Sequence, residues 1–127
     1  MNRVMLDASA VLAFVIGEPG SDRVPVMTGE AAISSVNYAE VVSIMIAQGM
    51  GETSVRQQLA QIVLDVIDFD RNLAEEAGFM IAKTKACGLS LGDRACLATA
   101  KREQIPALTS DRSWSKVDVG VQVQLIR

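Results

Sequence analysis

Short apolar segments alternate along the chain with longer segments of helical character, and this alternation is the feature that most restricts the fold. The apolar segments are too short for helices and are rich in aliphatic residues, which is typical of buried strands. We predict strands at 4–6, 31–33, 66–69, 106–109 and, at a sheet edge, 121–126, and helices at 8–17, 21–28, 36–48, 53–64, 70–87 and 90–104. Strands that alternate with helices are joined by right-handed crossovers, which make the strands parallel. The sequence therefore predicts an α/β fold, a three-layer α/β/α sandwich with a mostly parallel central sheet.

The length of 127 residues suits one core, so we expect residues 1–127 to form a single domain. The longest apolar runs are interrupted by polar residues and fall short of the ~20 residues that a membrane-spanning helix needs. The first apolar run is interrupted by Asp7 before any plausible cleavage site, which argues against a signal peptide. Cys87 and Cys96 do not form a C-x-x-C motif, which favours free thiols in a reducing compartment. We therefore expect a cytoplasmic protein that does not contact a membrane.

The chain contains no histidine, which excludes Ser-His-Asp and Cys-His catalysis. A hydrolase built from this sequence must use carboxylates, a lysine or a metal. The net charge is −3, from 12 basic and 15 acidic residues, which argues against a basic coat for nucleic acid. Acids that bind cations reverse the local field, however, so the net charge does not exclude a polyanionic substrate.

Four acidic residues lie close to the predicted carboxyl ends of the strands. Asp7 follows the first strand and Asp111 follows the fourth. Glu40 lies in the helix after the second strand, and Asp93 lies in the first turn of the helix before the fourth. Ligands of open parallel sheets bind at this edge, and carboxylate oxygens favour Mg²⁺ or Mn²⁺ over zinc. The four acids are therefore the predicted metal ligands and catalytic residues. Asp7 and Asp93 are the firmest contacts, and the other two would bind directly or through water.

Each acid also has a purely structural explanation. Asp7 and Asp111 are placed to cap the helix or turn that follows them, and Asp93 follows Ser90 at the spacing of a capping box. Glu40 lies in a helix that is apolar on nearly every side, which predicts burial all round. The polar stripe on that helix is either a solvated face or a buried one that needs a partner or a metal. This stripe consists of Asn37, Glu40 and Ser43.

The four acids lie in segments 4–10, 33–41, 89–98 and 106–114. In these segments, and in the loop 18–20, the chain resembles the PIN-domain ribonucleases, and within them the VapC-type toxins of type II toxin–antitoxin systems. The resemblance covers essentially the whole chain, no acidic position departs from it, and the segment around Asp93 is its most specific part. It implies a PIN-like α/β/α fold and Mg²⁺- or Mn²⁺-dependent endonucleolytic cleavage of RNA, such as tRNA or rRNA, which would inhibit translation. It also implies a homodimer and a cognate antitoxin as partner.

Other side chains have predicted roles around these acids. Ser9 and Thr109 are candidates to orient the acids. Arg94, Arg112 and Lys116 are close enough in sequence to the acids to contact RNA phosphates, and the alternative is that they are solvated surface charges. Three methionines are expected in the core, with a dimer face or a groove for an antitoxin helix as the alternative. They are Met45, Met50 and Met80.

Three other functions compete with a nuclease. The first is a catalytically inactive PIN-fold module that binds or regulates a partner, which the presence of all four acids disfavours. The second is a phosphoacceptor receiver domain, which needs an acidic pair near the first strand, whereas Asp7 stands alone there. The third is a dinucleotide-binding fold, which is disfavoured because no G-x-G-x-x-G motif follows a predicted strand.

Overall fold

The computed structural model describes residues 2–127 and is built around a five-stranded sheet in which every neighbouring pair of strands is parallel. The strand order is β3-β2-β1-β4-β5, so β1 is central and β5 is an edge strand, as predicted. β1 pairs on one side with β2 (Val4 opposite Ala31) and on the other with β4 (Leu6 opposite Leu108). The strands are β1 (Val4–Leu6), β2 (Ala31–Ser34), β3 (Asp65–Ile67), β4 (Ala107–Thr109) and β5 (Val123–Leu125).

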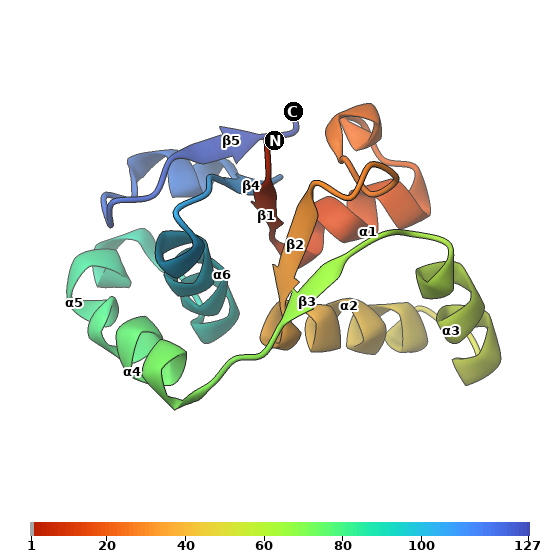
Figure 1. Cartoon of the computed structure of the whole chain (residues 1–127), viewed down its shortest axis with the longest axis horizontal. Helices are drawn as coiled ribbons and strands as arrows, with labels where there is room; N and C mark the ends of the chain where they lie inside the picture. The colour runs from red at the N-terminus through yellow and green to blue at the C-terminus, as the bar shows by residue number, and fades with distance from the viewer. Residues whose placement is uncertain (1) are drawn as a thin grey trace.

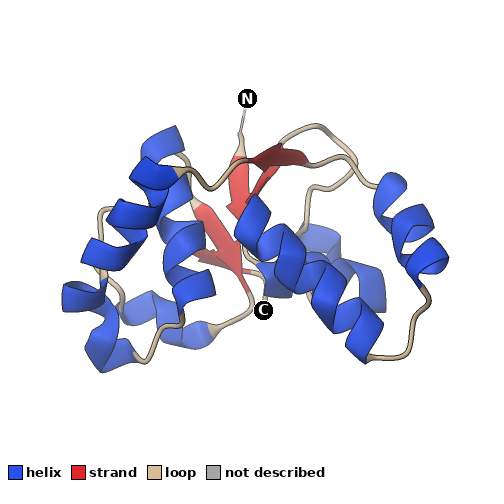
Figure 2. Cartoon of the chain, turned by 90° about the horizontal axis from the view of Figure 1, so that it is seen from below, coloured by secondary structure: helices blue, strands red, loops and turns tan. Residues whose placement is uncertain are grey.

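Helices cover both faces of this sheet (Figure 1). The main helices are α1 (Ala8–Ile16), α2 (Ser35–Ala47), α3 (Glu52–Ala60), α4 (Arg71–Phe79), α5 (Ile81–Thr84) and α6 (Leu91–Glu103). Successive residues of a strand face opposite layers. Val4 and Leu6 belong to the core under α1, α2 and α3, and Met5 belongs to the core under α4 and α6. The predicted three-layer α/β/α architecture is confirmed, and Figure 2 shows the two groups of helices on either side of the strands.

Two predicted helices differ from the structure. The segment 21–28 forms only a short 3-10 helix, η1 (Ser21–Arg23). The segment 70–87 is divided into α4, α5 and a 3-10 helix η2 (Lys85–Cys87). Gly78 weakens the helix just before this break, and the Thr84 hydroxyl donates to the carbonyl of Met80 at the turn. A third 3-10 helix, η3 (Arg112–Lys116), follows β4.

The prediction that α2 is buried all round is wrong. Only Asn37, Val41 and Met45 of this helix are buried, whereas Ile44 and Ile46 are 38% and 43% exposed. The reason is that α1, α3, α6 and the sheet cover only part of the surface of α2, which leaves Tyr38 and Val42 half-buried and Ile44 and Ile46 exposed. Asn37 is therefore the buried member of the predicted polar stripe, while Glu40 is partly exposed and Ser43 is exposed.

Within residues 2–127, no helix is both long and apolar enough to cross a membrane.

Candidate functional site

The predicted acids come from separate elements and lie toward the carboxyl ends of the parallel strands, which we call the carboxyl edge of the sheet. Asp7 comes directly after β1, and Asp111 comes two residues after β4. Glu40 lies in the second turn of α2, which follows β2, and Asp93 lies in the first turn of α6. α6 packs against both α2 and β1 (Figure 1), and this packing brings its first turn, with Asp93, next to the carboxyl ends of the strands.

The Asp7 side chain is held by two hydroxyl groups, one from α1 and one from β4. Its backbone occupies the N-cap position of α1, but its side chain makes no cap hydrogen bond. Instead, Ser9 Oγ and Thr109 Oγ1 donate to Asp7 Oδ2 at 2.8 and 2.9 Å. The structure thus places Ser9 and Thr109 on this carboxylate, and a structural capping role does not explain the position of the Asp7 side chain.

The surroundings of Asp7 oppose its charge. Asp7 is only 6% exposed, and its pKa is raised from 3.8 to about 6. Burial is the main cause and the negative charge of Asp93 adds to it, while the hydrogen bonds from the two hydroxyl groups lower the pKa in part. Within residues 2–127, none of the groups that shift this pKa is a basic side chain. At neutral pH, Asp7 is therefore a mostly ionised carboxylate without a neighbouring counter-cation, and binding of a cation would relieve this.

Glu40 is seated against the first turn of α6. Asn37 Nδ2 donates to Glu40 Oε1 at 2.9 Å and to the carbonyl of Gly92 at 3.0 Å. A Cβ atom at Gly92 would collide with both carboxylate oxygens of Glu40. The glycine therefore provides the space that brings Glu40 close to Asp93. Sequence reasoning missed this pair, although Asn37 stands one helical turn before Glu40 and Gly92 directly precedes Asp93.

Asp93 forms the predicted capping box. Ser90 Oγ accepts from the Asp93 backbone N–H at 3.2 Å, and Asp93 Oδ2 accepts from the Ser90 N–H at 2.9 Å. The predicted capping role of Asp93 is thus confirmed. Capping uses only one oxygen of the carboxylate, and the negative charge of Asp93 also raises the pKa of Asp7.

Cys96, one turn further along α6, marks where three of the acids converge. Its thiol is fully buried, and burial raises its pKa well above the usual value, with further contributions from the charges of Asp7, Asp93 and Glu40. The charges of these three carboxylates therefore all act on the same buried thiol beneath the carboxyl ends of the strands. Among residues 2–127, Asp111 is linked to Asp7 only through its backbone, whose N–H donates to the Thr109 hydroxyl at 3.1 Å. It is exposed, and its Oδ1 accepts from the backbone N–H and hydroxyl of Ser113 at 2.9 and 2.7 Å.

The donor chemistry of the three converging acids fits a hard divalent cation. They offer carboxylate oxygens, and among the ion pairs of residues 2–127 none involves these acids or Asp111. The buried Oδ1 of Asn37, beside Glu40, also has no hydrogen-bond partner in this part of the chain. Even so, no three acidic or cysteine side chains of residues 2–127 are near enough to one another to hold a single ion together. Binding would have to draw the carboxylates closer.

The basic residues near the acids differ in their freedom. Arg94 is tied to α4, because its Nη1 donates to the carbonyl of Ala77 at 2.8 Å and its Nε is buried. Its predicted contact with phosphate is therefore not favoured. Arg112 and Lys116 are exposed on η3, and η3 packs beside η2, which carries the exposed Lys85. These three side chains form the basic corner of the molecule.

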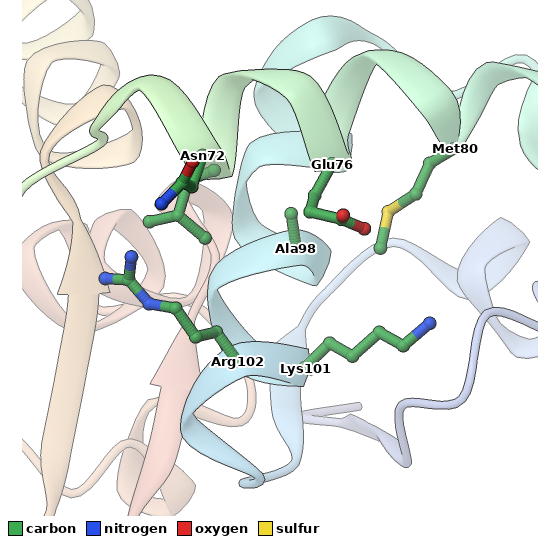
Figure 3. Close-up of a pocket in the computed structure, with 7 residues that line it drawn as sticks. Asn72, Glu76, Met80, Ala98, Lys101 and Arg102 are labelled. Atoms are coloured by element: carbon green, nitrogen blue, oxygen red, sulfur yellow. The ribbon is translucent and has the colours of Figure 1, made fainter.

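A separate cavity of about 240 Å³ lies between α4 and α6 (Figure 3). Asn72, Glu76 and Met80 of α4 line it opposite Ala98, Lys101 and Arg102 of α6, and Leu73 completes it. Its residues on α6 lie more than a turn beyond Asp93, and none of the four acids lines it. The cavity is therefore distinct from the acidic site.

Solved structures with the same fold include toxin–antitoxin proteins. The chain is similar to DNA-bound VapBC from Salmonella typhimurium (TM-score 0.74, 18% identity, 100% of both chains) and to VapBC-1 from nontypeable Haemophilus influenzae (TM-score 0.71, 18% identity, 97% of both chains). It is also similar to VapC20 of Mycobacterium tuberculosis, described as a toxin that cleaves the sarcin–ricin loop (TM-score 0.70, 17% identity, 88% of this chain and 92% of that one). At these identities, the similarity shows the fold alone.

Sequence comparison assigns the family. No curated protein gives a significant match to the chain. The family model of the PIN domain matches residues 4–120, which include all four acids and all strands but β5. This match confirms the resemblance to PIN domains that the four acidic segments indicated. The chain therefore belongs to the PIN-domain family.

Proposed function

We propose that the chain is a divalent-metal-dependent endoribonuclease that acts as the toxin of a toxin–antitoxin pair. The observation that supports the activity most directly is the placement of Asp7, Glu40 and Asp93 at the carboxyl ends of the strands: Asp7 is buried against two hydroxyl groups, and Glu40 packs against Gly92, the residue before Asp93. Among residues 2–127, none of the three acids forms an ion pair. Such a site attracts Mg²⁺ or Mn²⁺, and a bound ion supplies charge neutralisation of a phosphate and a water of lowered pKa. This chemistry needs no histidine, in agreement with the composition.

Each acid has a distinct part in this proposal. Asp7, fixed by Ser9 and Thr109, and Asp93, fixed by its cap, would hold the metal. Glu40 would complete the site from α2. Asp111 would act through water, because it lies at the exposed rim and its Oδ1 is engaged by Ser113. The basic corner formed by Lys85, Arg112 and Lys116 would bind RNA phosphates beside the acids.

The partners follow from the family and from the fold. Similar structures come from complexes described as toxin–antitoxin pairs, and one similar protein is described as an RNA-cleaving toxin. We infer that this chain is neutralised by a cognate antitoxin and cleaves a structured RNA such as tRNA or rRNA. The exposed apolar side chains of Phe79, Ile81 and Leu91 are consistent with burial in a homodimer.

The test is RNA cleavage by the purified protein in Mg²⁺ or Mn²⁺. We expect cleavage that EDTA abolishes, and a loss of at least 100-fold in Asp93→Asn, because a ligand charge is removed from the site. Asp22→Asn, the same change at an exposed acid of η1, is the matched control and should cleave normally. Normal cleavage by a folded Asp93→Asn protein would refute the proposed site.

The second candidate function is a catalytically inactive PIN-fold module that binds a partner. The observation that favours it is that no three of these acids stand close enough to hold one ion in the metal-free chain. This alternative predicts that RNA stays intact in every divalent metal, and that Asp93→Asn binds the partner as tightly as the wild type does.

A further inference from the structure

We propose that Asn37 is a positioning residue of the acidic site: its side chain ties Glu40 to the first turn of α6 and thereby sets where the Glu40 carboxylate stands relative to Asp7 and Asp93. This inference rests on the proposed metal-dependent activity. It assigns a role to a residue that is not one of the four proposed metal ligands.

The contacts of Asn37 join two elements that carry separate acids. Asn37 lies in the first turn of α2 and is 0% exposed. Its two Nδ2 protons have two acceptors, Glu40 Oε1 at 2.9 Å on its own helix and the Gly92 carbonyl at 3.0 Å on α6. The reverse orientation of the amide would turn Oδ1 toward both acceptors, so the two acceptors fix the orientation. Asn37 therefore couples the position of Glu40 to the backbone beside Asp93.

Gly92 leaves the space that the Glu40 carboxylate occupies. Any side chain at this position would occupy the space of the Glu40 carboxylate, which therefore lies directly against the α6 backbone. Oε1 is engaged by Asn37, and within residues 2–127 Oε2 accepts no hydrogen bond. One oxygen of Glu40 thus serves as an anchor, and the other stays available as a ligand.

Asn37 differs from an apolar core residue in what it offers to its two neighbours. Its amide donates to one oxygen of Glu40 and to the Gly92 carbonyl, while its own buried Oδ1 has no partner among residues 2–127. An apolar residue of similar size would fill the same space between the two helices but would supply neither donor. Such a residue would therefore leave the Glu40 carboxylate without its anchor.

The experiment is a double-mutant cycle on Mn²⁺ affinity, measured by calorimetry at neutral pH on the full chain. We expect Asn37→Leu to weaken Mn²⁺ binding by about 10-fold, the low end of what loss of a residue that orients a ligand costs. In a Glu40→Gln background, the same change should have almost no further effect, because Asn37 acts through Glu40. Asn72→Leu, the same substitution at an exposed position of α4, is the control and should leave the affinity unchanged.

Two further measurements separate positioning from folding. Asn37→Ser adds no charge, and its shorter side chain no longer reaches Glu40 or the Gly92 carbonyl, so it should weaken Mn²⁺ binding even if Asn37→Leu does not fold. In RNA cleavage, we expect kcat to fall while KM for RNA stays nearly constant, because the basic corner is untouched. An equal loss of Mn²⁺ affinity with and without Glu40 would overturn the positioning role and leave the proposed function standing. A wild-type protein that binds no Mn²⁺ and cleaves no RNA would overturn both.

Discussion

Asp7 and Asp93 carry the same chemical group in opposite structural circumstances. Asp7 is buried and its charge is opposed by burial, whereas Asp93 is half-buried and its carboxylate stabilises the start of α6. The same neutralising substitution should therefore have opposite effects on the folded protein at these two positions. Activity alone would not distinguish them, since both losses would abolish cleavage.

For Asp7→Asn, we expect a gain in the stability of the metal-free protein that depends on pH. The pKa of Asp7 rises from 3.8 to about 6 on folding, so between these values the unfolded chain releases a proton that the folded chain keeps. Stability from this group is therefore highest below pH 4 and falls by up to about 3 kcal/mol by pH 6 and above. Asn carries no charge and escapes this loss.

Urea unfolding in EDTA, from pH 4 to 7.5, measures the difference between Asp7→Asn and wild type. The difference should be near zero at pH 4 and grow toward pH 6 in favour of the variant. Asp22→Asn, at an exposed acid, should show no such trend. A difference in stability that is independent of pH would mean that folding does not raise the pKa of Asp7.

At the scale of the elements, the site depends on where helices begin. α6 starts with the capping box of Ser90 and Asp93, and α2 starts with Ser34, whose Oγ accepts from the Val36 N–H at 3.2 Å. These caps fix the first turns that carry Asp93 and Asn37. The precision of the site is therefore set by a few hydrogen bonds at helix starts.

Ser90→Ala tests this dependence. Loss of the Ser90 hydroxyl leaves the Asp93 N–H without its acceptor, so we expect a loss of about 1 kcal/mol in the free energy of unfolding. The urea midpoint should fall with an unchanged slope. Thr53→Ala, in the exposed first turn of α3, is the control and should have little effect. A Ser90→Ala protein as stable as the wild type would show that the cap is not needed to hold α6.

The sequence predicted those elements whose signals are local. All five strands, the capping box and the parallel sheet follow from short apolar runs, cap residues and alternation. The sequence did not predict the break at Met80, where no proline or helix-ending residue stands. It also did not predict the exposed side of α2, because the neighbours of a helix are not a local property. Among the acids, the sequence indicated the common edge, but not that the Asp111 side chain is engaged by Ser113 or that Asn37 and Gly92 position Glu40.

The whole molecule leaves large apolar side chains in contact with solvent. Phe79 is 71% exposed, and Leu91 and Ile81 are 57% and 50% exposed. Each belongs to the segment from the end of α4 to the start of α6. A single chain gains nothing from this exposure, whereas a second copy would remove it from water.

We therefore expect a dimer in solution, with a mass by light scattering of twice the 13.6 kDa of the chain at micromolar concentration. Phe79→Asp should shift the mass toward the monomer, because burial of the new charge at an interface is costly. Met27→Asp, at a 63% exposed methionine after η1, is the matched control and should leave the mass unchanged. A monomeric wild type, or a dimer unaffected by Phe79→Asp, would contradict this interface.

The hydroxyl that holds Asp7 has a consequence for synthesis on the ribosome. Thr109 belongs to β4, which completes its pairing with β5, and the Ile126 N–H donates to the Thr109 carbonyl at 3.1 Å. Thr109 lies 102 residues after Asp7, so Asp7 is synthesised well before the strand that carries this hydroxyl donor. A nascent chain that lacks β4 has Asp7, Glu40 and Asp93 but not the Thr109 hydroxyl that orients Asp7. The proposed nuclease would therefore be inert on the ribosome until β4 has been made and has paired with β1.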